Sequence, residues 1–144
     1  MNLPIFHLQP DQIPLYIDQP SDYIQLPHLH TFASVEEYYC TNFHECIHAT
    51  GNSKRLARKT VSVPSYFGSH EYSKEELVAE MGAAFLCAHA GIVNTTIENS
   101  AAYIKGWLKA LQDDKTFLVS EAAQAQKAAD YILCKKSIGS EKED

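Results

Sequence analysis

The feature that most constrains this chain is the run His44-Glu45-Cys46-Ile47-His48, an HExxH motif. It lies inside a segment whose two ends carry independent helix signals. Ser34-Val35-Glu36-Glu37 is a capping-box pattern that predicts a helix start, and Gly51 predicts its end. Histidines four positions apart share one face of a helix, so both imidazoles can reach one metal ion. The sequence therefore predicts a metal site on helix 34–51, and the alternative is a chance match to the motif.

Each residue type in the motif has a chemical role at a zinc site. Neutral imidazole is a good ligand for Zn²⁺, which makes His44 and His48 the expected ligands. Glu45 lies one position round the helix, where its carboxylate can reach a water in an open coordination position. Zinc lowers the pKa of a bound water to about 7, and a nearby carboxylate can then accept the proton. We therefore expect Zn²⁺ as cofactor and Glu45 as a catalytic general base.

A zinc hydrolase also needs a third protein ligand, and the acidic segment 70–91 offers Glu75, Glu76 and Glu80. This segment is otherwise apolar and predicts a second helix. We assign Glu76 as the third metal ligand and Glu80 as the residue behind a ligand histidine, where it accepts the other ring N–H. If Glu76 instead forms a capping box with Ser73, Glu80 becomes the ligand. Glu75 is expected to face solvent.

Length and charge restrict the class of protein. The 144 residues suit one domain, and 12 Lys and Arg against 18 Asp and Glu give a net charge of -6. Basic residues form no cluster, so direct binding of nucleic acid is not expected. No apolar run approaches the roughly 20 residues of a membrane span and no signal peptide is recognisable, which predicts a cytoplasmic protein. The four cysteines form no CxxC pair and are expected to remain thiols.

The patterning predicts an α+β fold that is mainly helical, with a small N-terminal β-ribbon. The ribbon is expected to pair strands 15–17 and 23–26 across a hairpin loop, and residues 52–69 are expected to be mostly irregular. The predicted domain covers residues 1–136, divided into the ribbon 1–33, the zinc helix 34–51, the acidic ligand helix 70–91 and C-terminal helices within 100–136, followed by a flexible tail 137–144.

Other residues give weaker signals. Tyr103 is a candidate donor for stabilising an oxyanion, and we include it among the catalytic residues, although core packing is the default for a tyrosine on a helix. His28 and His30 have a spacing that can bind metal but are more typical of a surface. His70 could line a cleft, and it would close the metal site if it were a fourth ligand. The strand 23–26 is a possible edge for pairing with an extended peptide, or an ordinary strand.

Several blocks of the chain, in order, resemble the C-terminal zincin-like metallopeptidase domain of the ArdC antirestriction family. The resemblance covers nearly the whole chain and is more specific than the HExxH motif alone. Its blocks are Tyr38-Tyr39 with HECIHATG, Arg55-Leu56, Phe67-Gly68-Ser69 with Tyr72, EELVAEMGAAFLCAHAGI, Ser100–Ile104 with Trp107-Leu108, and Ala128–Tyr131.

The resemblance implies a gluzincin-like site with His44 and His48 as ligands, Glu45 as base and a glutamate of the EELVAE block as third ligand. Placing that ligand at Glu76 follows a more distant similarity to the ImmA/IrrE peptidases, in which the ligand precedes a small residue by three positions, as Glu76 precedes Ala79. Family members are carried by mobile elements and have an N-terminal single-stranded-DNA-binding domain, which is expected to be missing here. Ala49 and Gly51-Asn52 depart from the family pattern and could alter the shape of the cleft.

Two functional hypotheses follow. The first is a zinc-dependent metallopeptidase that hydrolyses a peptide or protein substrate, associated with mobile elements or antirestriction. The second is a non-catalytic domain in which the metal only links two helices and the acidic surface binds host defence proteins. Glu45 favours the enzyme, because a structural zinc site has closed coordination and needs no general base.

Overall fold

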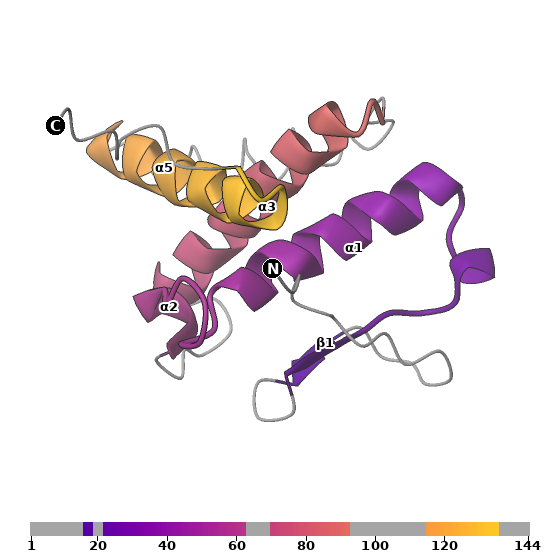
Figure 1. Cartoon of the computed structure of the whole chain (residues 1–144), viewed down its shortest axis with the longest axis horizontal. Coiled ribbons are helices and arrows are strands. Elements are labelled where there is room, and N and C mark those ends of the chain that lie inside the picture. Colours follow the sequence, from indigo (N-terminus) through magenta and orange to yellow (C-terminus); the bar gives the residue numbers. More distant parts are fainter. Residues whose placement is uncertain (1–15, 19–21, 63–69, 93–114, 136–144) are drawn as a thin grey trace, which may run out of the picture.

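The fold is built around one long helix that carries the HExxH motif. We describe a computed structural model, in which residues 16–18, 22–62, 70–92 and 115–135 are placed well enough to describe. The elements in chain order are β1 (Tyr16–Asp18), β2 (Tyr23–Gln25), the short 3-10 helix η1 (Leu29–Thr31), α1 (Val35–Thr50), α2 (Lys59–Ser62), α3 (His70–His89) and α5 (Lys115–Ile132). The β-ribbon lies on one side of α1, and α3 and α5 lie on the other (Figure 1).

Helix α1 begins and ends where its capping residues place it. The Ser34 hydroxyl accepts a hydrogen bond from the Glu37 backbone N–H at 3.1 Å. The Glu37 carboxylate accepts a hydrogen bond from the backbone N–H of Ala33. A capping box would instead use the N–H of Ser34, the next residue. At the other end, the Gly51 N–H donates to the carbonyl of His48 at 2.8 Å. The predicted zinc helix is therefore confirmed at both ends.

The two-stranded ribbon is antiparallel, as predicted, and pairs Ile17 with Ile24. Ile24 is fully buried against the helix through a small cluster that includes Ala49. An ion pair anchors the chain just before β2, because the Arg55 guanidinium donates to both carboxylate oxygens of Asp22. Arg55 also donates to the carbonyl of Ala49 at 2.7 Å, so the same side chain ties the ribbon to the end of α1.

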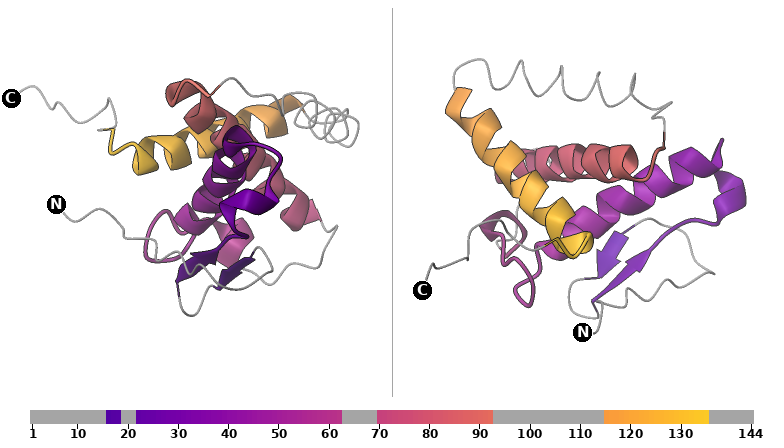
Figure 2. Two further views of the ribbon diagram at one scale, coloured as in Figure 1. Left: turned by 90° about the vertical axis from the view of Figure 1, so that its right-hand side faces the viewer. Right: turned by 45° about the horizontal axis from the view of Figure 1, so that its top comes forward.

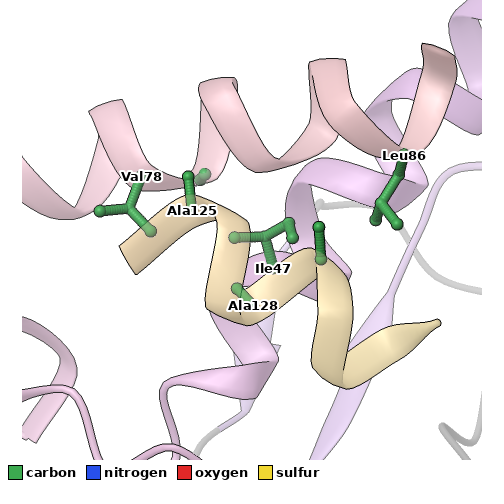
Figure 3. Close-up of a cluster of buried hydrophobic side chains, with 7 residues drawn as sticks. Ile47, Val78, Leu86, Ala125 and Ala128 are labelled. Carbon is green, nitrogen blue, oxygen red and sulfur yellow. The ribbon is translucent and has the colours of Figure 1, made fainter. Parts of the chain in front are cut away.

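The main core lies where α1, α3 and α5 meet. Ile47 from α1 lies between the side chains of the other two helices (Figure 3), and α5 crosses both of them (Figure 2). Helix α5 contributes mostly alanines, whose small side chains let the helix axes approach closely. The buried members of this cluster are Ile47, Val78, Ala79, Leu86, Ala125, Ala128 and Ala129.

A glycine sets the separation of α1 and α3. A Cβ atom on Gly82 of α3 would lie 2.6 Å from Cδ1 and 2.8 Å from Cγ1 of Ile47. Both distances are well below van der Waals contact, so a larger residue would push the two helices apart. Glycine lowers helix propensity by about 1 kcal/mol relative to alanine, and here that cost is offset by the close approach.

Some sequence-based predictions need correction or lie outside the described residues. The segment 52–69 is predicted to be mostly irregular; its described part, 52–62, contains hydrogen-bonded turns and the short helix α2, which the sequence did not indicate. Residues 93–114 lie outside the description, and with them the predicted helix 100–112; the tail 137–144 does so too. Within the described ranges no helix is long and apolar enough to cross a membrane.

We predict that Gly82→Ala destabilises the protein although alanine is the better helix former. The added methyl group overpacks the contact with Ile47, which typically costs about 1–3 kcal/mol of unfolding free energy. The matched test is a double-mutant cycle with Ile47→Val, which removes the Cδ1 methyl nearest the new Cβ. Urea unfolding should show a smaller cost for Gly82→Ala in the Ile47→Val background. An equal cost in both backgrounds would contradict this account of the contact.

Candidate metal centre

Two imidazoles from α1 face the same point in space. His44 and His48 lie one helical turn apart, and their Nε2 atoms are 3.0 Å from each other. The rings are nearly perpendicular, with centroids 4.7 Å apart, so both nitrogens aim into one small volume. The helix fixed at Ser34 and Gly51 thus positions the pair as the motif predicts.

The third donor comes from α3, and it is Glu76. One Glu76 carboxylate oxygen lies 3.4 Å from His48 Nε2 and the other lies 3.6 Å from His44 Nε2. Ligands about 2.0–2.1 Å from a tetrahedral zinc ion are separated by about 3.3 Å, so the observed spacings fit one ion. In the described part of the chain this is the only group of three or more His, Cys, Asp or Glu side chains close enough to share a metal.

The capping alternative for Glu76 is wrong. Helix α3 starts at His70, before Ser73, so Ser73 lies inside the helix and cannot be its cap. Glu76 is therefore available to the histidines. Glu80, the next carboxylate along the same face, places Oε1 3.5 Å from His44 Nδ1, the ring nitrogen on the far side from the cluster. That is the side on which Glu80 was predicted to act.

The expectation that Glu75 faces solvent is wrong. Its side chain is only 8% exposed, and Oε1 lies 3.1 Å from His48 Nδ1, where it can accept the ring N–H. Arg58 donates to both carboxylate oxygens, and the Thr60 hydroxyl donates to Oε2 at 2.6 Å. Glu75 thus orients His48 from behind, as carboxylates behind metal-binding histidines commonly do.

Arg58 is buried as well, and sequence analysis did not single it out. Its side chain is 4% exposed, and besides holding Glu75 it donates to the Ile47 carbonyl and the Thr50 hydroxyl at the end of α1. The helical stripe that carries Glu75 together with the buried Val78 and Ala79 is the signal that could have placed Glu75 inside. Nothing in the sequence pattern pointed to Arg58, because it belongs to a segment predicted to be irregular.

The buried charges set the protonation states of the cluster. Burial favours neutral His48, yet hydrogen bonds to Glu75 and Glu76 raise its pKa to about 9. Burial likewise disfavours ionised Glu76, but hydrogen bonds from His44 and His48 hold its pKa well below the usual range. The metal-free cluster therefore contains a protonated His48 and an ionised Glu76 at neutral pH. A bound cation takes the place of that proton.

Glu45 lies beside the cluster, and its pKa is shifted in the opposite direction to that of Glu76. Its side chain is 7% exposed, and burial raises its pKa, while the nearby His48 and His44 partly oppose that rise. A raised pKa brings a carboxylate closer to the range in which it can accept and return a proton near neutral pH. This burial next to the two histidines is compatible with the predicted role of general base.

The other predicted candidates either lie outside the described residues or lie apart from the cluster. Tyr103 lies outside the described residues, and so does the side chain of His70. His28 and His30 are exposed and stack on each other, with ring centroids 5.3 Å apart. They belong to no metal-binding group among the side chains that the structure describes.

We predict that Glu75→Gln weakens metal binding by about 10- to 100-fold, because His48 loses its ionised acceptor. Isothermal titration of the purified variant with zinc measures the affinity. Glu36→Gln, an exposed position in the first turn of α1, is the matched control and should bind as wild type does. Circular dichroism of the metal-free variant checks that it is folded, because Arg58 loses a charged partner. An unchanged affinity in folded Glu75→Gln would contradict the assignment.

We also predict that metal binding releases a proton. His48 faces Glu75, Glu76 and His44, and in the metal-free protein it keeps its proton up to about pH 9. Below that pH the metal must displace the proton, so affinity should rise by up to about tenfold per pH unit and level off above about pH 9. Chelator competition between pH 7 and 8.5 measures this slope. A flat profile would mean that His48 is neutral before the metal binds.

Solved structures of known proteins share this fold. The crystal structure of the antirestriction protein ArdC from plasmid R388 in its Mn(II)-bound form matches with a TM-score of 0.71 and 36% identity, over 92% of this chain and 48% of that one. Its metal-free form matches with a TM-score of 0.70 and 38% identity, over 90% and 46%. The resemblance to ArdC is confirmed, and the Mn(II)-bound neighbour supports a divalent metal in this fold.

Sequence relatives agree with the structural neighbours. The uncharacterised protein y4eC of Sinorhizobium fredii is 33% identical over 122 residues, which are 85% of this chain and 39% of the relative. The DNA primase TraC of Escherichia coli is 40% identical over 113 residues, 78% of this chain and 10% of the primase. The chain thus spans less than half the length of these relatives. A model of the zincin-like metallopeptidase family MPTase-PolyVal matches residues 8–125, and the chain belongs to that family.

Proposed function

We propose that this chain is a zinc-dependent metallopeptidase domain in which His44, His48 and Glu76 hold the metal and Glu45 is the general base. The observation that carries the proposal is a buried carboxylate beside three converging donors. Structural zinc sites have four protein ligands, whereas catalytic sites have three and an open position. Among the described side chains only three donors converge, which favours the catalytic class.

In the proposed mechanism each residue of the site has a separate role. When bound, zinc would acidify a water and polarise the carbonyl of the scissile peptide bond. Glu45 accepts the proton from that water and returns it to the leaving amine. Glu75 and Glu80 keep the two imidazoles turned toward the metal, from the Nδ1 sides of His48 and His44 respectively. Tyr103 remains a candidate donor to the oxyanion that forms during the reaction.

Zinc is proposed over manganese because of the donor set. Two imidazole nitrogens and one carboxylate form a common catalytic zinc site, whereas manganese prefers oxygen-rich sites. The similar ArdC structure contains Mn(II), so both ions belong in the test. Competitive loading with equal zinc and manganese should leave zinc bound.

The substrate class and setting are also proposals. A peptide or protein substrate suits the zincin-like family. The similarity to an antirestriction protein of a plasmid supports a role in mobile elements, acting in the cytoplasm. We propose that this domain itself does not bind nucleic acid, because its net charge is -6.

A second function is favoured by one specific observation. The donors come from two helices, His44 and His48 from α1 and Glu76 from α3, so a metal would bridge those helices whether or not it catalyses a reaction. The chain would then be a metal-stabilised domain that binds a host defence protein. The two functions predict different behaviour of the same variant.

We predict that Glu45→Gln abolishes peptide hydrolysis and leaves zinc affinity within about threefold of wild type. Loss of a general base typically costs about 10²–10⁴ in rate, whereas a residue that is not a ligand contributes little to affinity. New termini in a mixed peptide library, read by mass spectrometry, report hydrolysis. Glu76→Gln is the comparison variant and should lose both zinc and activity.

The outcomes separate the two functions. Hydrolysis that survives in pure Glu45→Gln protein would overturn the role of Glu45. A wild-type chain that binds zinc tightly but cleaves no peptide would favour the interaction domain.

A further inference from the structure

A pair of cysteine thiols outside the metal cluster spans the same two helices. Cys40 of α1 and Cys87 of α3 lie 47 residues apart in the sequence, yet their sulfur atoms are 3.0 Å apart. Neither cysteine is in a disulfide. The two other cysteines are placed differently, since Cys46 contacts Asn42 on its own helix and Cys134 is exposed after α5.

The thiol pair continues the alignment that builds the metal site. His48 faces Glu76, and one turn earlier in α1 His44 faces Glu80, one turn later in α3. Another turn back along α1 is Cys40, which faces Cys87 farther along α3. Because α1 and α3 run antiparallel through these three contacts, the two sulfur atoms meet farther along the same helix–helix interface. A link between them would join the two elements that carry all three metal donors.

The two thiols differ in exposure. Cys87 is 2% exposed and burial raises its pKa to about 12, so it is a poor first nucleophile. Cys40 is only partly buried, so it is the more exposed residue of the pair. Once Cys40 is oxidised, Cys87 needs no long movement to attack it, because a disulfide bond of about 2.05 Å is only about 1 Å shorter than the present separation.

We propose that Cys40 and Cys87 are an oxidisable thiol pair that forms an intramolecular disulfide when the chain meets a small-molecule disulfide such as oxidised glutathione. The Cys40 thiol loses its proton and attacks the oxidant, which releases one glutathione thiol and leaves a mixed disulfide. The Cys87 thiol then loses its proton and attacks the Cys40 sulfur, which releases the second glutathione thiol. Two protein thiols are oxidised to one disulfide, and one glutathione disulfide is reduced to two thiols.

The bond would fix the helices that form the metal site. The disulfide closes a loop that contains both histidines, Glu76 and the Arg58 network. It stabilises the fold mainly by lowering the conformational entropy of the unfolded chain, and this effect is larger for a long loop than for a short one. The metal-free protein should therefore gain thermal stability on oxidation. Because the proposal rests on the sulfur positions alone, it stands whether or not the metal site is catalytic.

The experiment uses the full chain with Cys134→Ser, which removes the exposed thiol that could link two molecules. The protein is treated with oxidised glutathione, and the remaining thiols are then alkylated. Before alkylation the oxidised chain should be about 2 Da lighter than the reduced form, and peptide mapping of the alkylated chain without reduction should find Cys40 joined to Cys87. The melting temperature without metal should rise by about 10 °C. Cys40→Ala and Cys87→Ala are the matched variants and should show neither change.

Two results would overturn the proposal. One is a stable mixed disulfide between Cys40 and glutathione with no link to Cys87, which would mean that the sulfur atoms do not meet. The other is two thiols that stay fully alkylatable after prolonged oxidation. Mapping of the wild-type chain carries the test even if an alanine variant fails to fold.

Discussion

The buried ion network at the end of α1 is the constraint on which the site depends. Arg58 neutralises Glu75, Glu75 accepts a hydrogen bond from His48, and the same guanidinium holds the last carbonyls of the helix. Breaking a buried ion pair by removing one partner commonly costs about 3–5 kcal/mol, because the other charge stays uncompensated. One arginine therefore connects the end of the zinc helix, the segment around α2 and the orientation of a metal-binding imidazole.

The cluster concentrates carboxylates that would repel one another without cations between them. Glu75 and Glu76 approach opposite nitrogens of the same imidazole, and Glu80 approaches the second ring. In the metal-free chain a protonated His48 and Arg58 supply the positive charge. A divalent metal would supply it instead at the point where the Nε2 atoms and Glu76 converge. The close α1–α3 contact at Gly82 makes that convergence possible, because it brings the two helices within reach of short side chains.

Much of the fold was predictable because local signals agreed with the tertiary structure. The cap at Ser34, the stop at Gly51 and the acidic helix 70–91 all appear where expected. Helix periodicity put Glu76 and Glu80 on one face, and the choice of Glu76 came from the resemblance to the ImmA/IrrE peptidases. What could not be predicted depends on contacts distant in sequence. Glu75 next to Glu76 looked like a surface charge, since its partner Arg58 lies in a segment without periodicity. The meeting of Cys40 and Cys87 likewise depends on how α1 and α3 align, which neither helix specifies alone.

In the proposed site two imidazoles and one carboxylate hold a zinc ion and leave one coordination position open. X-ray absorption spectroscopy of the zinc-loaded chain tests it most directly, because the scattering distinguishes nitrogen or oxygen from sulfur. Three protein ligands and one water should give four nitrogen or oxygen ligands at about 2.0–2.1 Å, with the multiple-scattering signal of two imidazoles. A sulfur ligand at about 2.3 Å, or the signal of a third imidazole, would contradict it.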